Sequence, residues 1–255
     1  KVGRPLNNKI ILRKGVTEST WEFASRQQLS KVRTDSLIVG DTQVKSVSEA
    51  RNLGVWFYSN FQVRSHINKT CQSAFFSLYN IRRIRKYLPF EAAKSLVQAF
   101  VISRIDYCNA ILYGLPAIHV NRLQRVQNAA ARLLTNTPRY SHITPVMINL
   151  HWLPVKFRII FKVNLLTFKA LHGLAPAYLS DIMLFKGDSN YNLRSNFSYL
   201  LARPAIRSAK TTGDRAFSVA APFLWNSLPE SLRAASSVNI FKKQPKTYLF
   251  KQAYW

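Results

Sequence analysis

The period of the hydrophobic pattern changes once along the chain, and this change constrains the fold more than any other feature. Between Asp35 and Asn60 apolar and polar residues alternate over short runs, as in half-buried strands, and Gly40-Asp41 predicts a turn. From His66 onward apolar residues recur every three or four positions, as on one face of a helix. We therefore predict a mainly α-helical chain with a small antiparallel β-hairpin near its N-terminus.

The stretch RNLGVWFYSN, residues 51–60, is the most apolar part of this predicted hairpin. We expect it to form the last strand, with Leu53, Val55 and Phe57 on one face. That face is expected to pack against the first helix, with Gly54 leaving room for a close backbone approach.

Three helical segments follow with short connections, which predicts a compact three-helix bundle over residues 61–137. The first ends at Pro89, the second begins at Phe90 and stops at Gly114, and the third runs from about Val120 to Leu134. The buried stripe of the second helix is expected to contain Leu96, Val97, Phe100, Val101, Ile105, Cys108 and Ile111.

A linker with two prolines, TNTPRYSHITP, predicts a boundary before a C-terminal helical region of residues 138–255. A strong helix ends there at Gly173, and a short one follows Pro176. Residues 186–215 are expected to form a loop or edge strands. The last helix, Asn239–Tyr254, is expected to be kinked or shortened by Pro245. Residues 1–34 show no sustained period and are expected to be weakly ordered.

No group of residues has the spacing of a self-contained active site. From Asp35 onward no two acidic residues are close enough in sequence to suggest a two-metal site, and the pair Glu18 and Glu22 is better explained as a solvated surface feature. Nucleophile, phosphate-loop and HExxH motifs are absent from the sequence. We attribute His151, beside Trp152, to packing at a helix N-terminus. No catalytic residue, metal ligand or cofactor of this chain is predicted.

The charge balance points to a polyanionic partner. The chain carries 37 Lys and Arg against 11 Asp and Glu, for a net charge of +26, which favours nucleic acid over an anionic membrane surface. The alternative is that the cations only solvate helix faces. Candidate phosphate-binding residues lie opposite the apolar stripes; they are Arg82, Arg83, Arg85, Lys86, Arg122, Arg125, Arg132, Lys156, Arg158 and Lys162.

Cysteine content and hydropathy indicate the compartment. Cys71 and Cys108 are isolated thiols without the spacing of a zinc site, which predicts a reducing compartment and no disulfide partner. No window offers the roughly 18 to 20 uncharged residues that a bilayer span needs. We therefore expect an intracellular protein, nuclear or cytoplasmic, with no membrane partner. Because the chain begins with Lys1 instead of Met, we also expect a fragment.

Six motifs in a fixed order resemble one known family. They are RNLGVWFYSN, HINKTCQSAFFSLYNIRRIRKYL, ISRIDYCNAILYGLP, LQRVQNAAARLLT, HITPVMINLHWLPVKFRIIFKVNLLTFKALHG and APFLWNSLPESLR. From about Arg26 to Phe250 the chain closely resembles the carboxy-terminal part of the polyprotein of jockey-like non-LTR retrotransposons, in the branch related to the chicken repeat.

The resemblance implies a role for each region. Leu53, Gly54 and Val55 match the primer grip of the reverse transcriptase, within a hairpin of residues 35–60. Residues 61–137 resemble the thumb that straddles the template–primer duplex, and Asn128–Arg132 match the end of that bundle. Residues 1–34 resemble a degenerate palm remnant, and residues 138–255 resemble the C-terminal region of the polyprotein.

The family's catalytic aspartates lie upstream of the primer grip and have no counterpart here, so Mg²⁺ is expected only for an intact parent enzyme. The resulting expectation is a nucleic-acid-binding fragment of an RNA-directed DNA polymerase. It would hold RNA and DNA as template–primer and would be inactive as an isolated chain. Two alternatives stay open: a basic scaffold protein that docks an acidic partner, and an inert retrotransposon-derived product.

Overall fold

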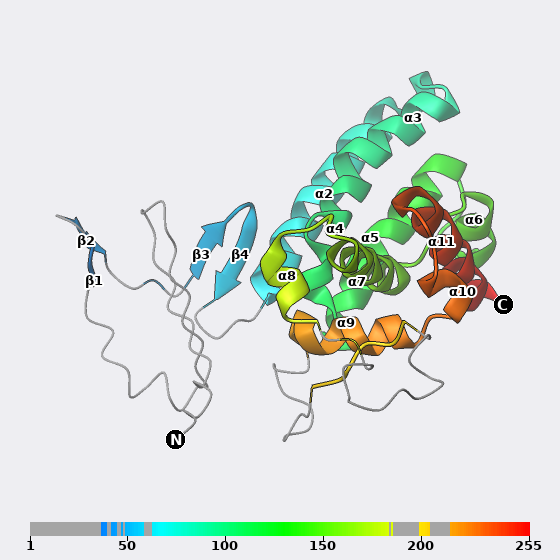
Figure 1. Cartoon of the computed structure of the whole chain (residues 1–255). Helices are drawn as coiled ribbons and strands as arrows, with labels where there is room; N and C mark the ends of the chain where they lie inside the picture. The colour runs from blue at the N-terminus through cyan, green and yellow to red at the C-terminus, as the bar shows by residue number, and fades with distance from the viewer. Residues whose placement is uncertain are drawn as a thin grey trace, which may run out of the picture. The chain divides into compact units, whose positions relative to one another are not determined.

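The protein is mostly helical, with two short antiparallel β-hairpins near its N-terminus (Figure 1). This confirms the predicted fold class. The computed structural model describes residues 37–39, 42–44, 47, 49–58, 63–183, 185, 199–204 and 215–255. The expected palm remnant, the Gly40-Asp41 turn and most of residues 186–215 lie outside this part. The chain divides into two compact units, Lys1–Ser73 and Ala74–Trp255.

The strands of the first unit form two separate hairpins. Strand β1 (Leu37–Val39) pairs with β2 (Thr42–Val44), and β3 (Glu49–Asn52) pairs with β4 (Val55–Tyr58). In the second hairpin Asn52 lies opposite Val55, so Leu53 and Gly54 are its two-residue turn.

This turn corrects the expectation for RNLGVWFYSN. The stretch is not one strand, because Leu53 and Gly54 have φ angles of 44° and 83° and reverse the chain between β3 and β4. Two positive φ angles are typical of a type I′ turn, whose twist matches that of the flanking strands. Leu53 is 84% exposed and does not share the buried position of Val55.

The second hairpin contacts the start of helix α2 (Arg64–Ile84) through Glu49 and Trp56, whereas the predicted face residue Leu53 and the glycine Gly54 form its turn. Glu49 Oε1 accepts hydrogen bonds from Ser65 Oγ at 2.7 Å and from Lys69 Nζ at 2.8 Å. The same ammonium lies 3.0 Å from the centroid of the Trp56 ring. These two bonds lower the pKa of the Glu49 carboxyl, because they favour its ionised form.

The second unit contains the three helical segments expected for residues 61–137, apart from the start of α2, which belongs to the first unit. Helix α2 ends at Ile84 and continues as a 3₁₀ turn, η1 (Arg85–Tyr87), before Pro89. The second segment is built from α3 (Phe90–Val97), the π-helix η2 (Gln98–Ile102), α4 (Ser103–Asp106) and the 3₁₀ turn η3 (Asn109–Leu112). Helix α5 (Ala117–Thr135) is the third, and it contacts both α3 and η2.

The π-helix changes which side chains of the second segment are buried. A π turn contains one residue more than an α turn, so it rotates the following residues around the axis. Val97 is buried before the turn, and both Val101 and Ile102 are buried within it. Phe100, which the α-helical period places in the core, is instead 49% exposed. Cys108 is half-buried and has a positive φ of 51° at the end of this segment.

Helix α7 (Val155–Leu171) is the centre of the second unit. It contacts α4, η3 and α5 of the bundle, and it also contacts three elements later in the chain. The remaining helices are α6 (Thr144–Asn149), α8 (Ala177–Asp181), α9 (Phe217–Asn226), α10 (Glu230–Arg233) and α11 (Val238–Tyr254). Because α7 packs on both sides of the expected boundary near residue 138, residues 74–255 form one unit.

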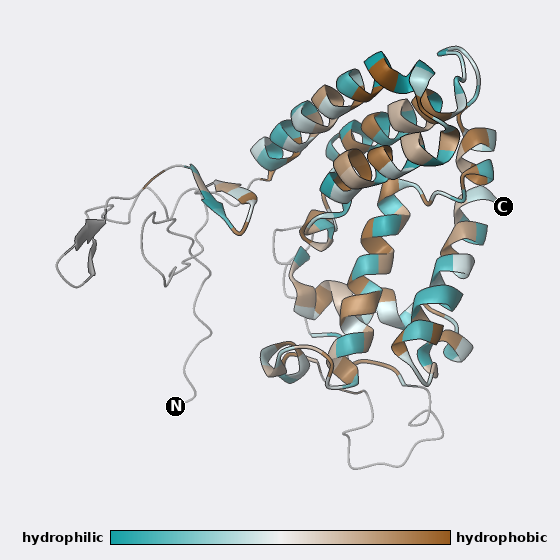
Figure 2. Ribbon diagram, turned by 90° about the horizontal axis from the view of Figure 1, so that it is seen from above, coloured by the Kyte–Doolittle hydropathy of each residue, from teal (hydrophilic) through white to brown (hydrophobic). Residues whose placement is uncertain are grey.

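Aromatic rings form the core between α7, α9 and α11. The rings of Phe168 and Phe241 stack with centroids 4.3 Å apart, and the Trp225 ring lies 5.7 Å from that of Phe241. All three side chains are fully buried. Hydrophilic and hydrophobic residues interleave along the helical ribbons (Figure 2), as expected for amphipathic helices around one core.

The last helix is not shortened by proline. Helix α11 runs from Val238 to Tyr254 with Pro245 buried inside it. A proline removes one backbone hydrogen bond, and the contact of α11 with α7 offsets this cost. Near the end of α11, the hydroxyl of Tyr254 donates to the carbonyl of Trp152, and burial raises the pKa of Tyr254 to about 12.

Candidate nucleic-acid interface

A basic pocket of about 1140 Å³ lies in the second unit, between α2, η1, α5 and the loop after α5. We use this name for the concave surface whose lining includes six cations: Arg82, Arg85, Lys86, Arg125, Arg132 and Arg139. Among the described residues that line it, none is acidic. Five of the six belong to the phosphate-binding candidates from the sequence.

Helical spacing explains why these cations converge. On α2 and η1, Arg82 and Lys86 are four residues apart, beside the buried stripe that contains Leu78 and Ile81. On α5, Arg125 and Arg132 are seven residues apart, which places them two turns apart on one face. When the apolar stripes turn inward, the two basic faces meet at the mouth of the pocket.

Two of the five arginines hold the backbone around the pocket. Arg85 donates to the carbonyls of Leu88 and Leu134, each at 2.9 Å, and to that of Leu133 at 3.3 Å. Arg132 donates to the carbonyls of Pro138 and Ser141, the latter at 2.8 Å. These bonds fix the end of α5 and the loop that follows it. Arg85 and Arg132 therefore shape the pocket and add charge to it.

The other four cations are exposed and free to bind a ligand. Lys86 Nζ lies 4.7 Å from the centroid of the Tyr87 ring. Within the described part of the chain, Arg82, Arg125 and Arg139 form no hydrogen bond or ion pair. A guanidinium fork without a protein partner is suited to bind the oxygens of a phosphate.

The acidic residues described in the second unit do not compensate this charge. Asp106 pairs with Arg158, and Glu91 lies 3.6 Å from Lys94 within α3. Asp181 and Glu230 lie on α8 and α10 and do not line the pocket. Because one sign of charge gathers in a concave surface, the field there attracts anions.

Two further bundle candidates lie outside the basic pocket. Arg83 lines a second, smaller pocket of about 550 Å³ together with Ile84, Leu96 and Phe100. Arg122 is half-buried on α5, it is not part of the basic pocket lining, and it already has an interaction within the protein. Their binding roles stay predictions.

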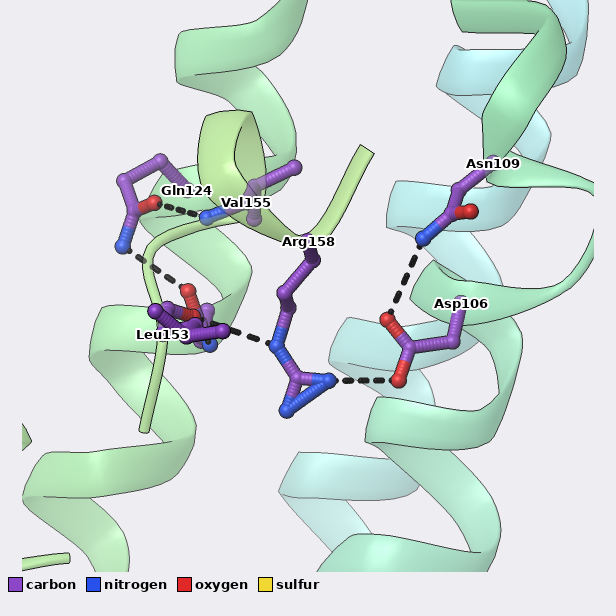
Figure 3. Close-up of polar contacts among 7 residues, drawn as sticks. Asp106, Asn109, Gln124, Leu153, Val155 and Arg158 are labelled. Atoms are coloured by element: carbon purple, nitrogen blue, oxygen red, sulfur yellow. Dashed lines mark hydrogen bonds and ion pairs between the residues drawn. The ribbon is translucent and has the colours of Figure 1, made fainter. Parts of the chain in front are cut away.

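The three candidates on α7 are also separate from the pocket. Arg158 Nη1 lies 2.5 Å from Asp106 Oδ2, and its Nε donates to the carbonyl of Leu153 at 3.1 Å (Figure 3). This arginine therefore holds α7 against α4. Lys156 is exposed, with Nζ 5.9 Å from the Phe157 ring centroid, and Lys162 is half-buried.

Two glutamines of α5 complete this polar network. Gln124 Oε1 accepts a hydrogen bond from the backbone N–H of Val155 at 2.8 Å, and Gln127 Nε2 donates to the Leu153 carbonyl at 2.9 Å. Figure 3 shows Gln124 reaching the start of α7 from one side, while Arg158 extends from α7 itself to Asp106 on the other side. The first N–H groups of a helix have no partner within it, so Gln124 serves as a cap from another element.

The three residues that match the primer grip lie in the first unit, at the tip of the second hairpin. Leu53 projects from the turn and is exposed, while Val55 is buried as the first residue of β4. A positive φ is uncommon for a residue with a side chain, so the tight turn holds Leu53 in a strained conformation. Whether this tip binds a primer stays a prediction.

Metal ligands do not gather in the described residues, where no group of three or more His, Cys, Asp or Glu could hold an ion. Cys71 and Cys108 are not joined in a disulfide. His151 is exposed, with its ring centroid 5.9 Å from that of Phe250, whereas its neighbour Trp152 is buried. Of the helices described, none combines the length and the apolar character that crossing a membrane requires.

Sequence reasoning missed some residues of the basic pocket. Arg139 lies in the linker TNTPRYSHITP, where no helical period assigns it to a face, and the helical pattern around Phe75 gives that residue no binding role. Asn128, Asn136 and Thr137 supply polar groups to the same lining. For Asn136, Thr137 and Arg139 the available sequence signal is their position directly after the helix that carries Arg125 and Arg132.

No protein-family model, curated protein or solved structure matches the chain.

Proposed function

We propose that this chain binds nucleic acid through the basic pocket, as a thumb-like part derived from a non-LTR retrotransposon reverse transcriptase. The observation that carries the proposal is the convergence of six cations, with no acidic residue among the described lining, on one concave surface. The resemblance of the sequence motifs to that family supports the same reading. The ligand implied is a template–primer duplex of RNA and DNA.

The chemistry of the pocket suits phosphate groups. Arg82, Arg125 and Arg139 offer planar guanidinium groups, which bind phosphate oxygens through two parallel hydrogen bonds. Arg85 and Arg132 are already held by backbone carbonyls, so little conformational entropy is lost when an anion enters. Asn128 and Asn136 add neutral donors of the kind that contact sugar and phosphate oxygens.

We further propose that the isolated chain cannot polymerise nucleotides. Metal-dependent nucleotidyl transfer needs carboxylates that hold two metal ions about 4 Å apart. In the described part of the second unit the carboxylates of Asp106 and Glu91 are occupied by ion pairs with Arg158 and Lys94. Incorporation of labelled nucleotides by the full chain on a primed RNA template would overturn this part of the proposal.

A salt titration tests the binding proposal. The affinity of the full chain for a labelled 20-base-pair duplex is measured between 50 and 300 mM salt, in the wild type and in Arg82→Gln/Arg125→Gln. Each lost phosphate contact is expected to reduce the slope of log affinity against log salt by about 0.9. The matched control is Lys242→Gln/Lys246→Gln, which removes two exposed charges from α11.

The two variants carry the same net charge, so only the position of the lost cations differs. The proposal expects a smaller slope for the pocket variant and a slope close to that of the wild type for the control. Equal slopes in both variants would show that the pocket is not the binding surface. Wild-type affinity that hardly changes with salt would favour the acidic protein partner considered above.

A further inference from the structure

Helix α2 exposes three aromatic side chains within little more than one turn. Phe75, Phe76 and Tyr79 are 45%, 66% and 61% exposed. Phe76 and Tyr79 lie on the side of the helix away from the buried residues Ala74 and Leu78, and Phe75 flanks the buried stripe. We call this group the aromatic ridge. Packing of the bundle does not explain why these rings are exposed, because α2 contributes to the core through the face that carries Ala74 and Leu78.

Cations adjoin the aromatic ridge on the same helix. Arg82 and Arg83 are three and four residues after Tyr79, and residues at these spacings are neighbours on a helix surface. Phe75 is itself part of the lining of the basic pocket, together with Arg82 and Arg125. The ridge and the pocket are therefore one continuous surface.

This combination decides which partner fits. A protein or lipid partner that covers three apolar rings would also have to cover Arg82 and Arg83, and burying unpaired charges is costly. A single-stranded nucleic acid supplies both matching groups, since its phosphates pair with cations and its bases stack on aromatic rings. In a duplex the bases are already stacked on one another, so their faces are not available to a protein ring.

We propose that an unpaired segment of nucleic acid stacks its bases on Phe76 and Tyr79 while its phosphates bind the basic pocket. This inference rests on the proposed function and adds that the template–primer ligand contacts the chain through an unpaired segment beside its duplex part. Four residues of helix cover about 6 Å of axis, so the ridge accommodates about two stacked bases. Stacking does not distinguish base identity, and the site is accordingly tolerant of sequence.

The test compares three labelled probes of equal length with the full chain. They are a 15-nucleotide oligothymidine, its duplex with oligoadenosine, and an abasic strand that keeps the phosphates and lacks the bases. The variant Phe76→Ala/Tyr79→Ala is expected to bind the oligothymidine roughly 10- to 100-fold more weakly, which is the usual contribution of base–aromatic stacking to affinity. Its affinity for the abasic strand and the duplex is expected to change less than about threefold.

Two control variants separate stacking from general damage. Tyr79→Trp keeps a ring at the site and is expected to retain or raise affinity for the oligothymidine. Tyr178→Ala removes a tyrosine from α8 that is exposed to a similar degree, 66%, and is expected to bind as the wild type does. Because all these side chains are exposed, the variants are expected to fold, which a thermal melt verifies.

Each other outcome has a distinct meaning. If the ridge variant binds oligothymidine as well as the wild type does, while Arg82→Gln/Arg125→Gln binds the duplex more weakly, the ridge is not a stacking site and the proposed function stands. Stacking is also refuted if the ridge variant loses the same affinity for all three probes. It is likewise refuted if the wild type binds the abasic strand and the oligothymidine equally well. If the wild type binds none of the probes, the proposed function fails. A ridge variant that changes only the sedimentation of the chain would identify the ridge as a contact between copies.

Discussion

Arg85 Nη2 donates a hydrogen bond to the main-chain carbonyl of Leu134 with an N–O distance of 2.9 Å. The last carbonyls of a helix have no partner within it, and Leu134 lies in the last turn of α5. The same guanidinium reaches the carbonyls of Leu133 and Leu88. One side chain of η1 thus closes the end of α5 and forms one wall of the basic pocket.

Replacing Arg85 by alanine is expected to destabilise the protein by about 2 to 3 kcal/mol, because half-buried carbonyls lose a charged donor. Arg85→Lys is expected to recover only part of the lost stability, because an ammonium group lacks the planar fork that reaches three carbonyls. Urea unfolding followed by circular dichroism measures both. Arg82→Ala, an exposed arginine one turn earlier, is the control, with an expected change below about 0.5 kcal/mol. Similar losses for the two alanine variants would contradict a capping role for Arg85.

The ion pair of Arg158 and Asp106 is expected to show a coupling free energy of about 1 to 2 kcal/mol in a double-mutant cycle of Arg158→Ala and Asp106→Ala. Both side chains are partly shielded from water, which strengthens the pair relative to surface pairs. The exposed pair Glu91 and Lys94 gives the comparison, with about 0.3 kcal/mol expected for a pair three residues apart on a helix. A coupling between Arg158 and Asp106 as small as that would mean that the pair does not hold α7 to α4.

Asn226 pairs with the backbone of Leu201 in the way a neighbouring strand would. Its Nδ2 donates to the Leu201 carbonyl at 2.8 Å, and its Oδ1 accepts from the Leu201 N–H at 2.9 Å. Asn226→Ala leaves both backbone groups of a buried residue unsatisfied and is expected to cost about 2 to 3 kcal/mol. Faster hydrogen exchange of the Leu201 amide checks the local effect. An unchanged exchange rate in a folded variant would refute this pairing.

His66 is expected to make stability depend on pH. Burial lowers the pKa of its imidazole below the ordinary value of 6.5, because the charged ring is poorly solvated there. The unfolded chain therefore binds the proton more readily than the folded chain. The contribution of His66 to the free energy of unfolding is expected to be constant well above pH 6.5. It is expected to decrease as the pH falls below that value.

The measurement is urea unfolding at pH 7.5 and 5.5 for the wild type and His66→Gln. The variant is expected to lose less stability on acidification than the wild type. His142→Gln, which removes an exposed ring, is the control and is expected to keep the wild-type dependence. A nuclear magnetic resonance titration that finds the His66 ring protonated above pH 6.5 in the folded protein would contradict the burial effect.

The helices are predictable from the sequence where the α-helical period holds without interruption. On α5, the predicted inward residues Leu123, Val126, Ala130 and Leu133 are all buried. On the second segment the prediction fails at Phe100, because one π turn rotates the stripe and the sequence carries no clear mark of it. The turn at Leu53 also has no clear mark in the sequence, because leucine rarely adopts a positive φ.

The candidate site was predictable in part. Arg82, Lys86 and Arg125 line the basic pocket, and their position follows from the spacing of cations around each apolar stripe. Arg158 has the same kind of spacing, yet it pairs with Asp106, 52 residues earlier in the chain. Arg139 lies in a loop and reaches the pocket only because Arg132 holds the carbonyls of Pro138 and Ser141.

By itself, the sequence determined the helical class, the presence of short strands near the N-terminus and the positive charge of the helix faces, because each follows from local periodicity and composition. Only the tertiary structure decided which cations meet in a pocket and which hold helices together. The period of a helix places Arg85, Arg125 and Arg158 relative to their own apolar stripes. What lies across from each side chain depends on contacts between residues far apart in the chain, and those contacts leave no local pattern.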